Sequence, residues 1–181
     1  GSKLDAVNWM NDNISELNKK IIDYTKENPE STGMGTTLVM AIITDEFLLF
    51  GNIGDSSGYV IKNEQLHKIT TDHTLVNMLV QSGELSEKEA KDHPRKNVLM
   101  RALGANNPIE IDIFDVENNN TDVLLCSDGL TNMLTDEQIE RVLAEEKNAE
   151  AVVDKLIRKA NARGGKDNIS IAYLKKESGD L

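Results

Sequence analysis

The chain has 181 residues, of which 39% are hydrophobic and 28% charged, and its formal net charge is −11. These values are typical of one folded, soluble domain and exclude a disordered or membrane-embedded protein. The acidic excess argues against broad contact with nucleic acid or anionic lipid, because both are polyanions. The longest apolar run, residues 38–43, is much too short to cross a bilayer.

Apolar residues at three- and four-residue steps from Leu4 to Tyr24 predict a first helix, which ends before Pro29. Two strands are predicted next, at residues 38–43 and 47–53, joined by a three-residue turn. A second short pair is predicted at residues 59–61 and 65–69.

The hydrophobic pattern changes from strand-like to mainly helical in residues 70–104. Leu75, Val76, Leu79 and Val80 have helical spacing, and a capping box begins at Ser86. Apolar residues resume the helical pattern over residues 98–103. We therefore predict a mainly helical insertion between two strands.

The last third of the chain predicts three strands and two helices. Isoleucines alternate with acidic residues over 109–113, which is typical of a half-buried strand, and the apolar run 123–126 predicts a central strand. Thr135 with Gln138 caps one helix, and a helix over residues 152–160 ends at Gly164. An alternating strand follows over residues 169–173.

Strands joined by short turns imply antiparallel sheets, and the helices need apolar faces to cover. We predict an α+β fold, an α/β sandwich of stacked layers, in one domain spanning residues 1–181.

Three aspartates, Asp55, Asp128 and Asp167, each stand at one end of an apolar, strand-like run. Carboxylates at strand ends can converge at one rim of a sheet, and hard divalent cations favour such oxygen clusters. Asp, Asn and Gly are equally typical of tight turns, so turn chemistry remains the alternative interpretation for each aspartate.

Other reactive side chains give weaker signals. His73 and His93 have no metal-ligand spacing to a cysteine or a third histidine, and Arg95 is as consistent with a solvated basic patch as with a phosphate site. Cys126 lies inside an apolar run, where cysteine is usually a small hydrophobic side chain. A single cysteine cannot form an intramolecular disulfide, so we expect a reducing cytoplasm. Gly1-Ser2 resembles a cleaved-tag scar, and no signal peptide follows it.

Six motifs occur in a recognisable order. They are Gly33-Met34-Gly35-Thr36-Thr37, Ile53-Gly54-Asp55-Ser56, Thr71-Asp72-His73-Thr74-Leu75-Val76, His93-Pro94-Arg95-Lys96-Asn97, Leu124-Leu125-Cys126-Ser127-Asp128-Gly129-Leu130-Thr131 and Gly164-Gly165-Lys166-Asp167-Asn168-Ile169. In this order they resemble the bacterial branch of the metal-dependent protein serine/threonine phosphatases, the protein phosphatase 2C family.

The resemblance implies two stacked antiparallel sheets flanked by helices, with residues 70–104 as a flap. It implies a centre of two or three Mn²⁺ or Mg²⁺ ions, whose bridging water attacks the phosphorus of phosphoserine or phosphothreonine. By residue match, Asp128 and Asp167 correspond to ligands of the core metal pair, and Asp55 with Asp128 to a third site. Ser56, Gly129 and Asn168 would support these ligands, and His73, His93 and Arg95 are flap or substrate candidates.

The sequence departs from the family pattern in two places. Ser57 stands where members usually carry an arginine. The acidic Asn-Glu-Asp segment, the phosphate-binding arginine and the Asp-Gly-Met-Gly-Gly-His motif are not found in the 181 residues. We therefore expect an N-terminally truncated phosphatase, inactive or nearly so, with sheet edges that favour self-association.

The partners implied are phosphorylated proteins and a cognate serine/threonine kinase, without nucleic acid or membrane insertion. Two rival interpretations remain open. One is a non-catalytic module that binds phosphoproteins or another partner, and the other is a regulatory subunit whose remaining strands come from a second chain.

Overall fold

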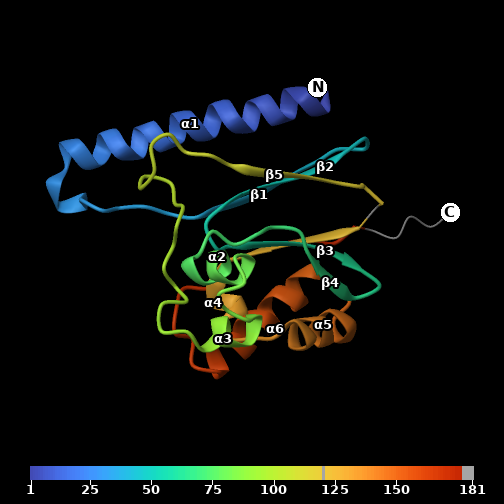
Figure 1. Ribbon diagram of the computed structural model, residues 1–181. Coiled ribbons are helices and arrows are strands. Elements are labelled where there is room, and N and C mark those ends of the chain that lie inside the picture. The colour runs from blue at the N-terminus through green and yellow to red at the C-terminus, as the bar shows by residue number, and fades with distance from the viewer. Residues whose placement is uncertain (120, 177–181) are drawn as a thin grey trace.

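The computed structural model, which describes residues 1–119 and 121–176, has four layers (Figure 1). One sheet has three antiparallel strands in the order β1-β2-β5, and the other has four in the order β4-β3-β6-β7. Helix α1 lies along the outer face of the first sheet, and α4, α5 and α6 lie on the outer side of the second (Figure 1). The predicted fold class is confirmed.

The strands are β1 Leu38–Ile43, β2 Leu48–Ile53, β3 Ser57–Lys62, β4 Gln65–Lys68, β5 Asp112–Val116, β6 Asp122–Cys126 and β7 Ile171–Leu174. The helices are α1 Lys3–Glu27, the short 3₁₀ helix η1 Pro29–Ser31, α2 Leu75–Gln81, α3 Glu87–Asp92, α4 Asp128–Thr131, α5 Asp136–Glu145 and α6 Ala149–Ala162.

Helix α1 covers the first sheet with one apolar face. Its start is fixed by a capping box between Ser2 and Asp5, and it ends at Glu27, with Asn28 as the C-cap, because Pro29 follows. Met10 and Ile14 of this helix are buried against residues of β1 and β2. Within the described part of the chain, no helix combines the length and the apolar character needed to cross a membrane.

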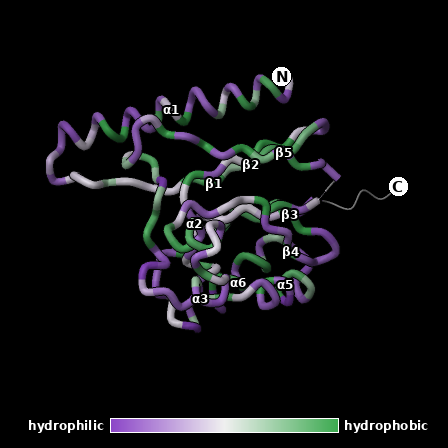
Figure 2. The backbone as a smooth tube through the Cα atoms, in the orientation of Figure 1, coloured by the Kyte–Doolittle hydropathy of each residue, from purple (hydrophilic) through white to green (hydrophobic). Residues whose placement is uncertain are grey.

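Strand β2 contributes to two cores because alternate side chains point to opposite faces of a sheet. Leu48 and Phe50 pack between the two sheets with Val60 and Val123. Leu49, on the other face, packs with Met10 beneath α1. Figure 2 shows hydrophobic stretches, coloured green, along β1, β2 and β3, the strands that face these two cores.

The second sheet packs against α5 and α6 through Tyr59, Leu124 and Cys126 on one side and Val142 and Leu156 on the other. Cys126, the single cysteine of the chain, is 3% exposed, and burial raises the pKa of its thiol to about 12. The prediction that Cys126 is a small hydrophobic side chain agrees with this burial.

The segment 70–104 is less helical than its apolar pattern predicts. Helices α2 and α3 form, and Ser86 caps α3 with the expected capping box. The predicted helix over residues 98–103 is wrong, because no helix forms there. Leu99 pairs with Thr74 and Leu103 with Thr36, so pairing to distant segments replaces the local helix.

Strand β5 begins three residues later than its alternating isoleucines predict. Its ladder with β2 starts where Asp112 faces Asn52, and β2 ends one residue later, before the turn at Gly54. Ile109 and Ile111 therefore pack under α1 without a strand partner for their backbone in the ladder.

Candidate active site

Sheet register places the three predicted aspartates at one rim of the second sheet. Ser57 at the start of β3 pairs with Cys126 at the end of β6, and Cys126 also pairs with Ile171 at the start of β7. Asp55 lies just before the start of β3, Asp128 just after the end of β6, and Asp167 in the loop that leads into β7. The rim formed by these three aspartates is called the acidic rim below.

Electrostatic coupling links the carboxylates of the acidic rim. Burial, followed by the charges of Asp128 and Asp72, raises the pKa of Asp55 to about 6. Burial, followed by the charge of Asp167, raises the pKa of Asp128 above its ordinary value. Like charges disfavour ionisation only at short range, so Asp128 interacts with both other aspartates.

Hard cations suit this donor chemistry, because carboxylate oxygens are their preferred ligands and a cation would relieve the repulsion. Among residues 1–119 and 121–176, no group of three or more His, Cys, Asp or Glu side chains is arranged so that it could hold a metal ion.

The loops that carry Asp128 and Asp167 are joined directly. The Ser127 N–H donates to the Ser170 carbonyl oxygen at 3.0 Å, and the Ser170 N–H donates to Ser127 Oγ at 3.0 Å. Asn132 Nδ2 lies 3.3 Å from Asp128 Oδ2 and donates to it. The Asp128 carboxylate is therefore held by Asn132 at the end of α4, and Ser127 joins the Asp128 turn to the loop that carries Asp167.

Gly129 is required at this junction by close approach of two backbones. A Cβ at position 129 would collide with the carbonyl oxygen of Asn168. That carbonyl also accepts a hydrogen bond from Ser127 Oγ at 3.1 Å. The Asn168 backbone N–H donates to Asp167 Oδ1 at 2.7 Å, so Asn168 orients Asp167 through its main chain.

Ser56 holds the Asp55 turn to a preceding loop. Its side chain is buried, and its Oγ lies 2.8 Å from Thr37 Oγ1. Gly54, before Asp55, has φ +102°, a conformation that L side chains rarely adopt. The glycine-rich loop of residues 33–37 thus contacts this turn through Thr37.

The three flap candidates occupy different environments. His73 is enclosed between Gly54 and Asp112, and its side chain is 9% exposed. His93 caps the C-terminus of α3, and its Nδ1 accepts a hydrogen bond from the exposed Arg95 N–H at 3.1 Å. His73 is thus joined to the Asp55 turn, whereas His93 and Arg95 lie at the end of α3.

Sequence reasoning did not single out Asp72 or Lys68 as members of this neighbourhood. Lys68 Nζ lies 2.8 Å from Asp72 Oδ1, and the charges of both residues act on Asp55. Asp72 stands inside the Thr71-Asp72-His73 motif, which was the available signal. Lys68 had none, because its place depends on the end of β4.

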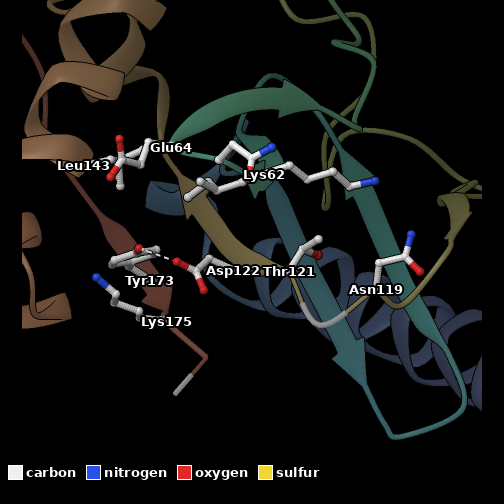
Figure 3. A pocket seen from close by; sticks show the side chains of 10 residues that line it. Lys62, Glu64, Asn119, Thr121, Asp122, Leu143, Tyr173 and Lys175 are labelled. Carbon is white, nitrogen blue, oxygen red and sulfur yellow. Dashed lines mark hydrogen bonds between the residues drawn. The ribbon is translucent and has the colours of Figure 1, made fainter. Parts of the chain in front are cut away.

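One cavity is separate from the acidic rim. It has a volume of about 520 Å³ and is lined by Lys62, Glu64, Asp122 and Tyr173 among others. Ile61 pairs with Asp122, so this cavity lies at the end of β3 and β6 opposite to Ser57 and Cys126. Figure 3 shows Tyr173 directed at Asp122, and its Oη donates to Asp122 Oδ2 at 2.8 Å.

Comparisons with known proteins place this arrangement in a family. The family model described as "Protein phosphatase 2C" matches residues 3–170. The serine/threonine phosphatase stp of Listeria welshimeri is 43% identical over 169 residues, which are 93% of this chain and 67% of that protein.

Two solved structures are also similar. The serine/threonine phosphatase Stp1 from Staphylococcus aureus has a TM-score of 0.92 and 35% identity, covering 98% of this chain and 70% of that one. The catalytic domain of the serine/threonine protein phosphatase PstP in complex with two manganese ions has a TM-score of 0.73 and 31% identity, covering 86% of this chain and 65% of that one. From the ordered motifs, the sandwich fold and these matches, we conclude that the chain belongs to the protein phosphatase 2C family of serine/threonine phosphatases.

Proposed function

We propose that the acidic rim forms part of a metal-dependent site that hydrolyses phosphoserine and phosphothreonine in proteins. The observation that carries the proposal is the meeting of three strand ends, with mutual repulsion between Asp128 and its two aspartate neighbours. The similarity to a phosphatase whose structure was solved with two manganese ions supports Mn²⁺ or Mg²⁺ as the cofactor.

In this proposal Asp55, Asp128 and Asp167 would supply carboxylate oxygens to the cations, with Asp128 central because its charge couples to both other aspartates. When bound, such cations lower the pKa of water and thereby supply a nucleophile at neutral pH. Ser56, Gly129 and Asn168 hold the turns that carry Asp55, Asp128 and Asp167. The segment 70–104 is the proposed flap, since it begins next to the Asp55 turn.

The 181-residue chain is proposed to have little activity by itself. Its sequence contains no Asp-Gly-Met-Gly-Gly-His run, and Ser57 replaces the arginine typical of the family. Its described residues present no three-carboxylate cluster that could hold an ion. A bound cation would therefore keep more water ligands and be held more weakly.

The proposed substrates are proteins phosphorylated by a serine/threonine kinase, in a reducing compartment such as the cytoplasm. The names of the relatives support serine/threonine specificity, and the buried Cys126 is compatible with reducing conditions. The choice among phosphoproteins would lie with the surface around the rim and the segment 70–104.

A turnover assay tests the proposal. The chain and a version extended by a segment with an Asp-Gly-Met-Gly-Gly-His motif and an arginine are compared on a phosphothreonine peptide, with Mn²⁺ or with EDTA. We expect the extended chain to be at least about a hundredfold faster, because loss of transition-state charge stabilisation typically costs 10²–10³ in rate. An extended, folded chain that binds phosphopeptide without Mn²⁺-dependent turnover would favour the binding-module interpretation instead.

Self-association through sheet edges is part of the proposal and is tested separately. Strands β1 and β7 end the sheet orders, and Leu174 on β7 is 45% exposed beside an apolar groove that also contains Ala41, Ile43 and Leu125. Unpaired strand edges favour pairing with another copy. Light scattering should report a dimer or larger species at micromolar concentration, and a monomer at all concentrations would contradict this part.

A further inference from the structure

The His73 imidazole bridges the Asp55 turn and strand β5. The Gly54 N–H lies 2.9 Å from Nδ1, and Asp112 Oδ2 lies 2.7 Å from Nε2. Because a backbone N–H can only donate, Nδ1 must be the unprotonated acceptor. The ring proton therefore resides on Nε2 and is donated to Asp112, which fixes one neutral tautomer of His73.

The main chain of His73 holds the same turn. The His73 N–H donates to the Gly54 carbonyl oxygen at 2.9 Å, so both peptide groups of Gly54 bond to one residue. Asn52 Nδ2 donates to the same carbonyl at 3.2 Å and to the Thr71 carbonyl at 2.9 Å. The direction in which the chain leaves Gly54 toward Asp55 is thereby set by residues 71–73.

The far side of His73 is anchored as well. Asp112 Oδ1 accepts a hydrogen bond from Arg101 Nη1 at 2.6 Å, and Arg101 also donates to the Glu110 carbonyl oxygen at 3.1 Å. The Met100 N–H donates to the His73 carbonyl oxygen at 2.8 Å. Both ends of the segment 70–104 therefore meet at His73 and Asp112.

We propose that His73 is a positioning residue, which sets the direction of Asp55 and couples the acidic rim to both ends of the segment 70–104. The proposal deepens the proposed function, on which its consequence for cation binding rests. Its structural part, the tether from His73 to Gly54, is independent of any catalytic activity. His73 is thus assigned to the interior of the site, away from direct contact with substrate.

The tautomer is measured first, on the unsubstituted chain. Long-range ¹H–¹⁵N NMR of the imidazole should show an unprotonated Nδ1 and a protonated Nε2 at neutral pH. The opposite tautomer would overturn the proposal, since Gly54 would then face a second donor. This measurement requires no variant and so does not depend on whether a substitution folds.

Two substitutions then separate the two contacts of the ring. In His73→Asn, Oδ1 takes the place of Nδ1 and can still accept from Gly54, whereas in His73→Gln the amide reaches toward Asp112 and leaves Gly54 without its acceptor. His67→Asn, on the exposed face of β4, is the matched control. Circular dichroism and thermal unfolding verify that each variant is folded.

Hydrogen exchange at the Gly54 amide and Mn²⁺ affinity are the two readouts. We expect exchange about fivefold faster in His73→Gln, the factor for one lost hydrogen bond, and near the unsubstituted rate in His73→Asn. Mn²⁺ affinity should fall about tenfold in the Gln variant, as is typical when a partner outside the ligands is lost, and less in the Asn variant.

The outcomes are distinguishable. Equal Gly54 exchange in the two His73 variants and the His67 control would overturn the tether. Faster exchange in His73→Gln with unchanged Mn²⁺ affinity would uphold the tether and overturn the proposed coupling of His73 to the acidic rim, without bearing on the cation site itself.

Discussion

The two ends of strands β3 and β6 carry aspartates in opposite circumstances. At one end, Asp55 and Asp128 are partly buried beside other carboxylates, and the pKa of each is raised by burial and by that repulsion. At the other end, Asp122 accepts hydrogen bonds from Tyr173 Oη and from the Lys176 N–H at 2.8 and 2.9 Å. A cavity of about 520 Å³ lies beside Asp122.

The cavity and the mutually repelling carboxylates therefore lie at opposite ends of β3 and β6. Asp122 is satisfied by its own chain, so its carboxylate serves local structure. In the acidic rim, burial and neighbouring carboxylates raise the pKa values of Asp55 and Asp128. Perturbed pKa values of this kind are typical of functional sites. The proposed function places the chemistry at the rim, and the following predictions test that placement.

The largest expected effect is on turnover in the extended chain. Asp128→Ala should lower Mn²⁺-dependent hydrolysis by about 10²–10³, because a group that supports the transition-state charge is lost. Asp122→Asn at the opposite end should leave the rate within about twofold. Initial rates on a phosphothreonine peptide measure both, and a rate unchanged in Asp128→Ala would contradict the placement.

A stability effect of about 2 kcal/mol is expected for Gly129→Ala, within the range for overpacking a close contact. The added Cβ would collide with the Asn168 carbonyl oxygen and push the Asp167 loop away from Asp128. Urea unfolding measures the cost. Because the collision is with main chain, Asn168→Ala in the same molecule should not relieve it, and full relief would show that the side chain is responsible.

A smaller effect concerns pH. The pKa of Asp55 is about 6 in the folded chain against an ordinary 3.8, so between these values the folded chain binds more protons than the unfolded one. The free energy of unfolding therefore falls as pH rises through this window, and the stabilisation present below pH 4 is lost above pH 6. Screening at a partly exposed carboxyl reduces the expected loss to about 1 kcal/mol.

Asp55→Asn should remove this loss and flatten the pH dependence. Urea unfolding at pH 4.5 and 7 in EDTA is compared between the variant and Asp45→Asn, an exposed aspartate in the β1–β2 turn. If the free energy of unfolding changed equally with pH in the two variants, the pKa of Asp55 would not be raised by burial and its neighbours.

Local patterns in the sequence predict much of this fold. The strand at residues 38–43 and the capping box of Thr135 and Gln138 form as their patterns indicate, because each depends on near neighbours. The stretch 98–103 does not form a helix, since its backbone pairs with Thr74 and Thr36, which no local period can reveal.

The same distinction holds at the candidate site. Asp55, Asp128 and Asp167 can be singled out in the sequence because each stands at one end of an apolar run. The pairing of His73 with Asp112 joins residues 39 positions apart and depends on the register of β5 with β2. Asn168 contacts the Asp167 carboxylate through its main-chain N–H, which side-chain reasoning does not predict.

Binding of Mn²⁺ to the 181-residue chain tests the central claim most directly. Calorimetry should show weak binding that Asp128→Asn lowers at least about tenfold, because Asp128 is the carboxylate that couples to both others, whereas Asp122→Asn should change it less than about twofold. Tight binding of two ions would contradict a weak, incomplete site. Equal losses in Asp128→Asn and Asp122→Asn would contradict the assignment of the cation site to the acidic rim.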